Sequence, residues 1–376
     1  MSGYDTSPRA ARNCGDSAGP DRPASANKAI RIMVVDDSLV ARTVLCKVVE
    51  ATEDFVLCAT ANTAEEALSK LADIRVDVIL LDLEMPGIGG LAALPAILEA
   101  AQGAQVMVVS SLTSVGAEAT VEALSIGAAD TILKPRPGEF SSEYRSELAD
   151  RIRDIGNTRG RPDRARTGAP AASVRLRNTA AKPARVIAIG ASTGGIHSMC
   201  QVLGKLPKDF DLPILVTQHL PAAFSPVFAR QLEIASGFTA IIAQTGSPLI
   251  AGEILIAPGA GHLVVELSGG VPVARITRDK VANNCCPSVD PMLESLAGVY
   301  DGAVLAVILS GMGRDGEIGA RAIVDRGGMI LAQSPETCAV WGMPRAVAEA
   351  GLASAILPPE GLGARIANCK RGAAWQ

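Results

Sequence analysis

Aromatic residues and histidine are scarce in this 376-residue sequence. Phe, Trp and Tyr make up only 3% of the chain, so its cores must be built from Ala, Val, Ile and Leu. Aliphatic cores of this kind are typical of parallel sheets that helices bury on both faces. Because only three histidines are present, a zinc site built from Cys and His would be hard to assemble.

The eight cysteines have no C-x-x-C spacing. Cys46, Cys58 and Cys200 lie in apolar stretches, as reduced core thiols do. Cys285 and Cys286 are adjacent, and adjacent cysteines rarely pair with each other. We therefore expect a reducing compartment, the cytoplasm.

The sequence also lacks long apolar runs and a large excess of one charge. Its formal net charge of −4 gives no general attraction to nucleic acid or to anionic lipid. No stretch approaches the roughly 18–20 apolar residues that a transmembrane helix requires. Residues 1–28 lack an apolar core, so we expect a disordered leader and not a signal peptide. These absences predict no nucleic-acid binding and no direct membrane insertion.

Short β-type runs alternate with helical stretches in two separate segments, which predicts an α/β protein of two doubly wound, mainly parallel-sheet domains. Residues 29–156 contain five such runs, as expected for a flavodoxin-like sheet. Residues 185–368 contain a second series, as expected for a Rossmann-like α/β domain. Within it, Leu263–Leu267 and Val271–Thr277 flank a Gly-Gly turn and predict a β-hairpin.

Residues 157–184 differ in composition from both segments. Arg, Pro, Gly, Ala and Thr dominate without apolar periodicity, so we expect a flexible linker. A basic tail that binds nucleic acid or lipid is the alternative, but no interleaved aromatic residues support it. Residues 369–376 are expected to be a C-terminal tail.

Carboxylates follow two of the predicted strands in the first segment. Asp36 and Asp37 end the first run, and Asp82 ends the third. Because the C-terminal ends of parallel strands converge, these carboxylates would repel each other unless a hard cation such as Mg2+ lay among them. One carboxylate could then attack a phosphoryl donor. Ser110 and Lys134, at the ends of the fourth and fifth runs, could bind the phosphoryl oxygens.

The segments VVDDS, LLDLEMPG, VVSS and ILKP resemble those of two-component receiver domains. The resemblance implies a phosphoacceptor, a set of Mg2+ ligands and a pair of phosphate-responsive side chains. Thr131 stands where receivers often carry an aromatic residue, which argues against a bulky rotamer switch there. The implied residues are the phosphoacceptor Asp82, the metal ligands Asp36, Asp37, Asp82 and the Glu84 carbonyl, and the responsive pair Ser110 and Lys134.

A run of small residues, IGASTGG, leads from an apolar strand into a predicted helix. Small neighbours allow a sharp turn, expose the Ser192 hydroxyl and let backbone N–H groups approach a substrate oxygen. Similar turns open the nicotinamide-binding unit of short-chain dehydrogenases, which also need a Tyr-x-x-x-Lys pair. None of Tyr4, Tyr144 and Tyr300 has a lysine four residues on, which excludes that class.

A serine nucleophile needs a base, and histidine is the usual one near neutral pH. His197 and His262 are the other candidates, but only His219 directly follows an apolar run, so it would lie at a strand end beside Ser192. Asp315 lies in a Gly-rich loop after another apolar run and could orient the imidazole. The order Ser–His–Asp differs from the Ser–Asp–His order of ordinary α/β-hydrolases.

The segments IGASTGG, TQHLPAAFSPVFARQL, CCPSVD, ILSGMGRDG and VWGMPRAV resemble the catalytic domain of chemotaxis protein-glutamate methylesterases. The resemblance implies Ser192 as nucleophile, His219 as base, Asp315 as orienting acid and the Met312 backbone N–H as oxyanion donor, with no cofactor for the esterase. It also implies phosphorylation-regulated hydrolysis of glutamate methyl esters on methyl-accepting chemoreceptors, with release of methanol, and deamidation of receptor glutamines. A chemotaxis histidine kinase would be the phosphodonor.

Two other classes of function are less consistent with the sequence. A phosphorylation-controlled binding module with an inactive hydrolase domain would lack part of the triad, whereas all three candidates are present. A transcriptional regulator would need a compact helical DNA-reading unit, but the second segment is rich in predicted strands and not basic. Arg314 replaces the smaller residue common in its loop, and we expect it to alter substrate approach while leaving the triad intact.

Overall fold

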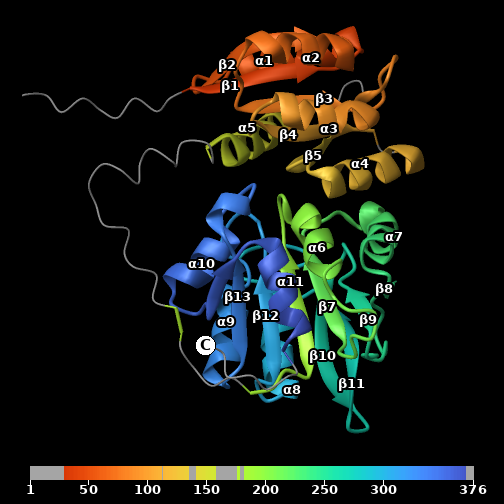
Figure 1. The fold of residues 1–376 in the computed structure, drawn as a ribbon, viewed down its shortest axis with the longest axis vertical. Coiled ribbons are helices and arrows are strands. Elements are labelled where there is room, and N and C mark those ends of the chain that lie inside the picture. The colour runs from red at the N-terminus through yellow and green to blue at the C-terminus, as the bar shows by residue number, and fades with distance from the viewer. Residues whose placement is uncertain (1–28, 112, 135–140, 158–175, 178–181, 370–376) are drawn as a thin grey trace, which may run out of the picture.

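The structure is a computed structural model that describes residues 29–111, 113–134, 141–157, 176–177 and 182–369. The predicted leader, most of the predicted linker and nearly all of the predicted tail lie outside these residues. The described residues form two α/β units, one above the other in Figure 1.

The first unit is a parallel five-stranded sheet with strand order β2-β1-β3-β4-β5. Its central strand β3 is buried along its whole length, as expected for a parallel sheet covered by helices on both faces. Ser141 caps the last helix by accepting a hydrogen bond from the Tyr144 N–H at 3.3 Å. The strands are β1 (Ile30–Val35), β2 (Phe55–Ala61), β3 (Val78–Asp82), β4 (Gln105–Ser110) and β5 (Asp130–Leu133). The helices are α1 (Leu39–Glu50), α2 (Ala64–Asp73), α3 (Gly90–Ala100), α4 (Ser114–Ile126) and α5 (Ser142–Gly156).

The second unit has a parallel seven-stranded sheet with strand order β14-β13-β12-β6-β7-β9-β8. The chain builds outward from β6 to one edge and then from β12 to the other, so the order reverses between these two neighbouring strands. Ligand sites of open α/β sheets lie at such a reversal, beyond the C-terminal strand ends. The strands are β6 (Val186–Ala191), β7 (Ile214–Gln218), β8 (Thr239–Ile242), β9 (Glu253–Ile256), β12 (Val304–Ile308), β13 (Met329–Gln333) and β14 (Ala355–Leu357).

The predicted hairpin is present, but β10 (His262–Ser268) and β11 (Val271–Thr277) form a separate two-stranded sheet. Helix α8 packs on this hairpin and also against β6. A side chain at Gly190 of β6 would lie only 2.5 Å from Val289, so glycine is needed for this close approach. The helices of the second unit are α6 (Gly195–Leu203), α7 (Ser225–Ser236), α8 (Val289–Val299), α9 (Glu317–Asp325), α10 (Met343–Glu349) and α11 (Pro359–Ala367).

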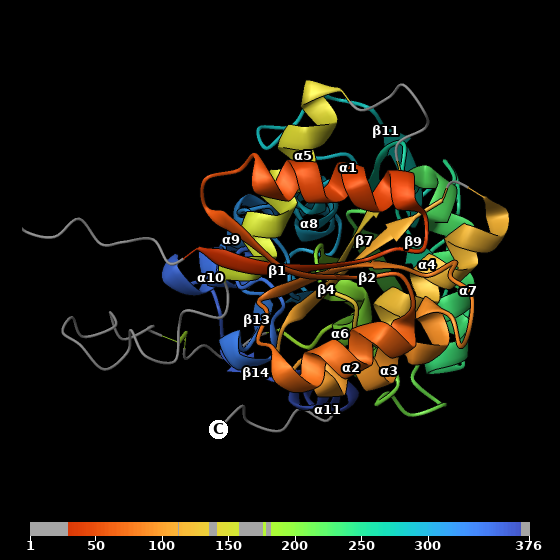
Figure 2. The same cartoon turned by 90° about the horizontal axis from the view of Figure 1, so that it is seen from above.

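The two units are in direct contact at the C-terminal end of the larger sheet. Helix α4 of the first unit packs against α6 and α7 of the second, and both views place the first unit over this end (Figures 1 and 2). The Ser125 carbonyl accepts a hydrogen bond from His197 Nδ1 at 2.7 Å, and the Ser125 hydroxyl accepts one from Gln231 at 3.0 Å. Val340 of the second unit is buried within the core of the first. The first unit therefore covers the strand ends where the candidate nucleophile lies.

Candidate active site and phosphoacceptor site

Ser192 directly follows β6 and precedes α6. Its N–H donates to the Ser310 carbonyl at 3.0 Å, and its own carbonyl accepts from the Gly195 N–H at 2.8 Å. Gly194 has a φ of 73°, in the left-handed region that favours glycine. A side chain at Gly311 would lie 2.7 Å from the Ser192 Cβ, so the two loops approach each other closely. These contacts hold the serine at the N-terminal end of a helix, where backbone N–H groups favour negative charge.

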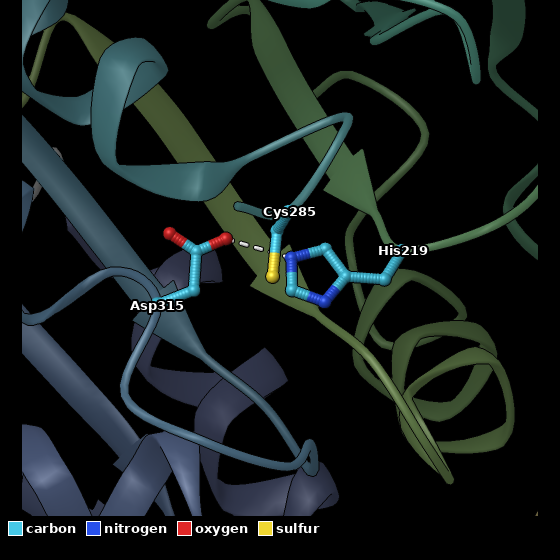
Figure 3. Close-up of side chains that lie close together, drawn as sticks. All are labelled: His219, Cys285 and Asp315. Carbon is cyan, nitrogen blue, oxygen red and sulfur yellow. Dashed lines mark hydrogen bonds and ion pairs between the residues drawn. The ribbon is translucent and has the colours of Figure 1, made fainter. Parts of the chain in front are cut away.

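His219 and Asp315 form a hydrogen-bonded pair, drawn in Figure 3. The His219 Nε2 lies 2.7 Å from the Asp315 Oδ2, and Asp315 is only 2% exposed. His219 follows β7, and its N–H donates to the Ala191 carbonyl of the adjacent strand at 3.1 Å. Asp315 lies in the loop between β12 and α9. With Nε2 on the carboxylate, the other ring nitrogen, Nδ1, is left to serve as a base.

The Asp315 carboxylate accepts three further hydrogen bonds from one segment. The Ser288 hydroxyl donates to Oδ1 at 2.8 Å, the Val289 N–H donates to Oδ2 at 2.7 Å, and the Asp290 N–H donates to Oδ1 at 3.1 Å. Burial alone would raise the pKa of the Asp315 carboxyl, but the hydrogen bonds from His219, Val289 and Ser288 outweigh burial and lower the pKa. The carboxylate is therefore ionised at neutral pH and fixed in orientation.

Asp290 is a second buried carboxyl group beside Asp315, and the sequence reasoning missed it. Its Oδ1 accepts a hydrogen bond from the Gly319 N–H at 2.9 Å in the first turn of α9. Burial and then the negative charge of Asp315 raise the pKa of Asp290. Asp290 thereby ties α8 to the helix that follows Asp315. Its only signal in the sequence is its place in the CCPSVD segment.

Ser192, His219 and Met312 line one cavity of about 1160 Å³. Its other wall belongs to the first unit and includes Thr131 and Arg151. Met312 is 46% exposed, so this apolar side chain lies at an accessible surface of the cavity that Ser192 also lines. The cavity is large enough for an extended side chain, but the first unit forms its other wall and limits the approach of a folded protein.

The other two histidines have structural partners. His197 donates to the Ser125 carbonyl across the domain boundary and accepts from Gln201 Nε2 at 3.0 Å. His262 is 3% exposed, donates to the Asp279 carbonyl and accepts from the Ser288 N–H, both at 3.0 Å. His219 is thus the histidine that faces the cavity with Ser192, as its position after a strand predicts.

In the first unit, Asp36, Asp37 and Asp82 place carboxylate oxygens within 4.8 Å of one another. Asp36 and Asp82 are 0% and 2% exposed, and Lys134 pairs with them at 3.1 and 2.6 Å. Burial, together with the charge of Asp36, raises the pKa of Asp82 despite Lys134. One lysine against three carboxylates leaves the cluster negative, and an all-oxygen donor set suits Mg2+.

The remaining predicted residues of this cluster lie beside it. Glu84 donates its N–H to the Asp82 Oδ1 at 3.1 Å, and its side chain accepts from the Ser111 hydroxyl at 3.0 Å. Ser110, which is 2% exposed, lies 3.5 Å from the Thr131 hydroxyl, oxygen to oxygen. A contact between two hydroxyl groups thus occurs at the position where many receivers carry an aromatic residue.

One expectation about cysteine is wrong. Cys58 is exposed, whereas Cys46 and Cys200 are half-buried. Cys58 lies on the edge strand β2 at the point where the register with β1 shifts, so it has no partner residue on β1 and its side chain is exposed.

A family model described as CheB methylesterase matches residues 187–366, and one described as response regulator receiver domain matches residues 32–143. Protein-glutamate methylesterase/protein-glutamine glutaminase 2 of Caulobacter vibrioides is 40% identical over 348 residues, which cover 92% of this chain and 100% of that protein. This chain belongs to the protein-glutamate methylesterase/protein-glutamine glutaminase family. Protein-glutamate methylesterase/protein-glutamine glutaminase 1 of Paramagnetospirillum magneticum is 39% identical over 365 residues, covering 90% of this chain and 95% of that protein.

Among solved structures, the Thermotoga maritima CheB methylesterase catalytic domain aligns with a TM-score of 0.48 and 36% identity, covering 49% of this chain and 98% of that chain. The family resemblance and the α/β fold class inferred from the sequence are confirmed.

In this methylesterase Arg314 is exposed at the rim of the Asp315 loop and pairs with Glu317 at 2.7 Å. Within the described ranges, no helix is both long and apolar enough to cross a bilayer.

Proposed function

We propose that this chain hydrolyses glutamate 5-O-methyl esters on methyl-accepting chemoreceptors, releasing methanol, and deamidates selected receptor glutamines. The observation that carries the proposal is the His219–Asp315 pair, 2.7 Å apart, in the same cavity as Ser192. The three residues follow β7, β12 and β6, which are neighbours at the centre of the sheet. Family membership supplies the substrate class.

The reaction uses Ser192 as nucleophile and His219 as base. Nδ1 of His219 takes the Ser192 hydroxyl proton while Oγ attacks the ester carbonyl, and Asp315 stabilises the imidazolium that forms. The Met312 N–H and the N-terminal end of α6 stabilise the oxyanion. When the C–O bond of the ester breaks, Nδ1 returns its proton to the leaving methanol. Water then attacks the acyl-enzyme by the reverse route and releases the glutamate carboxylate.

Deamidation follows the same path, with ammonia as the leaving group. Both reactions pass through one glutamyl-serine ester, so a single triad serves both substrates. No step of this esterase route requires a cofactor, since serine, imidazole and carboxylate supply the nucleophile, the base and the orienting charge.

The receiver domain controls access to this site. A chemotaxis histidine kinase phosphorylates Asp82, with Mg2+ held by Asp36, Asp37, Asp82 and the Glu84 carbonyl. The cation, when bound, neutralises charge on the transferring phosphoryl group. Ser110 and Lys134 then turn toward the phosphate oxygens.

Phosphorylation weakens the contact between the two domains. Lys134 directly follows β5, and two residues at the start of this strand contact the Ser192 loop. Asp130, the first residue of β5, accepts from the Thr193 hydroxyl at 3.1 Å, and the carbonyl of Ala129, which precedes β5, accepts from the Gly194 N–H at 2.7 Å. Moving Lys134 from Asp82 to a phosphate therefore shifts the strand that holds the receiver over Ser192. The location that fits this role is the cytoplasm, with no nucleic-acid partner and no direct membrane insertion.

Methanol release from methylated receptor membranes tests the proposal. We expect release by the full chain, faster after addition of a small-molecule phosphodonor with Mg2+. No methanol release under either condition would contradict the proposed esterase.

A further inference from the structure

Cys285 lies beside the catalytic pair, and the proposed mechanism does not use it. The ligand atoms of His219, Cys285 and Asp315 all lie within 4.8 Å of one another. Figure 3 places the thiol next to the imidazole and the carboxylate. We propose that these three residues form an inhibitory binding site for a soft divalent cation such as Zn2+. The ligands are Nε2 of His219, Sγ of Cys285 and Oδ2 of Asp315, with water in the fourth position.

The donor set is the kind that Zn2+ takes in proteins: one imidazole, one thiolate and one carboxylate, with an open fourth position. Zinc bonds of about 2.0–2.2 Å to nitrogen and oxygen place those two atoms roughly 3.3 Å apart in a tetrahedral site. His219 Nε2 and Asp315 Oδ2 are 2.7 Å apart, so the pair must open by a fraction of an ångström. His219 is half-buried at the cavity wall, where the ring can make this movement.

The electrostatics of the site favour a cation. Burial, followed by the negative charges of Asp315 and Asp290, raises the pKa of the Cys285 thiol to about 11. The thiol is therefore neutral and a poor nucleophile without metal, which argues against a redox role. The same negative field attracts a divalent ion, whose charge in turn favours the thiolate.

The segment that carries Cys285 is held in place by a chain of hydrogen bonds. The Cys285 N–H donates to Asn283 Oδ1 at 2.9 Å, and Asn283 Nδ2 donates to the Ser288 hydroxyl at 3.2 Å. Ser288 in turn donates to Asp315 Oδ1 at 2.8 Å. These contacts anchor Oδ1, while Oδ2 accepts from the Val289 N–H at 2.7 Å and keeps its His219 side for the metal.

Metal binding and catalysis exclude each other. When the cation occupies Nε2 of His219, the ring proton moves to Nδ1, the nitrogen that would accept the Ser192 proton. The base is then blocked, and the bond between His219 and Asp315 is lost. Metal binding releases the thiol proton of Cys285, because the thiolate is the form that binds zinc.

The site differs in chemistry from the receiver cluster. Asp36, Asp37 and Asp82 offer only oxygen, which suits Mg2+, whereas a thiolate and an imidazole select softer ions. Millimolar Mg2+ should therefore fill the receiver without inhibiting the esterase. The loss of activity rests on the proposed role of His219, but metal binding itself does not.

The test uses the full chain with Mg2+ in large excess, and Co2+ as a spectroscopic probe. Wild type, Cys285→Ser and Cys286→Ser are compared, the last as a matched control because Cys286 is the adjacent thiol outside the cluster. We expect a thiolate-to-cobalt charge-transfer band in wild type and Cys286→Ser, its loss in Cys285→Ser, and its displacement by Zn2+. A band that persists in Cys285→Ser would overturn the site.

Methanol release gives the second readout, with each variant normalised to its own metal-free rate. Zn2+ should inhibit wild type and Cys286→Ser at concentrations at least about tenfold lower than Cys285→Ser. Equal zinc sensitivity of all three proteins would also overturn the proposal. A chain without any esterase activity would refute the proposed function instead, while the cobalt spectrum would still decide the metal site.

Discussion

The Gly194 N–H donates a hydrogen bond to the Ala129 carbonyl across the domain boundary, at 2.7 Å. Gly194 is two residues from Ser192, and Ala129 directly precedes β5, which ends one residue before Lys134. A single backbone contact thus joins the loop of Ser192, the proposed nucleophile, to the strand that leads to the cluster of Asp36, Asp37 and Asp82. The following predictions test the catalytic set, this coupling and the groups that support them.

Weakening the contact between the two domains, at a position away from Ser192, should raise the rate of methanol release by the unphosphorylated protein. Gln231→Ala removes the hydrogen bond to the Ser125 hydroxyl, and a bond of this kind contributes about 0.5–1.5 kcal/mol. We expect unphosphorylated methanol release to rise about 2- to 10-fold. Glu118→Gln is the control, since its contact with Arg230 is exposed and 3.9 Å long. Equal rates of methanol release by Gln231→Ala and wild type would contradict the proposal that the receiver domain covers the active site.

Phosphorylation should relieve inhibition only partly. Switching a docked state from about 1:99 to 99:1 requires roughly 5.5 kcal/mol, whereas one phosphate cluster supplies a few kcal/mol. Thr131 also lacks the bulk of the aromatic residue that acts as a rotamer switch in many receivers. We therefore expect initial rates with a phosphodonor to stay below those of the free fragment 185–376. Asp82→Asn should not respond to the phosphodonor, and a full response by that variant would place the phosphoacceptor elsewhere.

Metal chelation should separate the two sites. Because the receiver cluster is expected to need Mg2+ and the triad needs no metal, a chelator should block phosphorylation of Asp82 without lowering the basal esterase rate. Phosphoprotein formation and methanol release measured in the same sample test this. A fall in basal rate on chelation would mean that the catalytic chemistry has been misassigned.

Asp290 should make stability depend on pH. Its pKa is raised in the folded state, so the unfolded chain ionises first and folded stability falls as the pH rises above about 4. Asp290→Asn keeps an acceptor for the Gly319 N–H and stays neutral. We expect this variant to be more stable than wild type at pH 7 and equally stable near pH 4, measured by urea unfolding.

The matched variant Asp290→Ala tests the hydrogen bond itself. Removing the acceptor leaves the buried Gly319 N–H without its partner, at a cost of about 1–3 kcal/mol. We expect Asp290→Ala to be less stable than Asp290→Asn at every pH. If the two variants unfold at the same urea concentration, the contact contributes nothing to the fold.

Strand-end residues could be predicted from the sequence because parallel strands converge by rule. Asp82, Ser192 and His219 each follow an apolar run directly, so strand prediction alone brings them to the right edge. The hydrogen bonds to Asp315 could not be predicted in this way. Ser288 reaches Asp315 across 27 residues, and no periodicity reveals which loop folds over a site.

The errors and omissions have similar causes. Cys58 lies in an apolar run, but only the strand order reveals that β2 is an edge. The strand β14 (Ala355–Leu357) has three residues, too few for an alternation to be recognised. The contact between Gly194 and Ala129 depends on how two domains dock, which neither domain's pattern encodes.

The most direct test of the account is methanol release from methylated receptors by Ser192→Ala, His219→Ala and Asp315→Asn, each checked for native folding. Because triad members act as a unit, we expect the serine and histidine variants to lose at least about a thousandfold in rate, with the double variant little worse. Asp315→Asn should also be severely impaired, since the imidazole loses its orienting charge. Near-wild-type release by folded Ser192→Ala protein would contradict the serine mechanism.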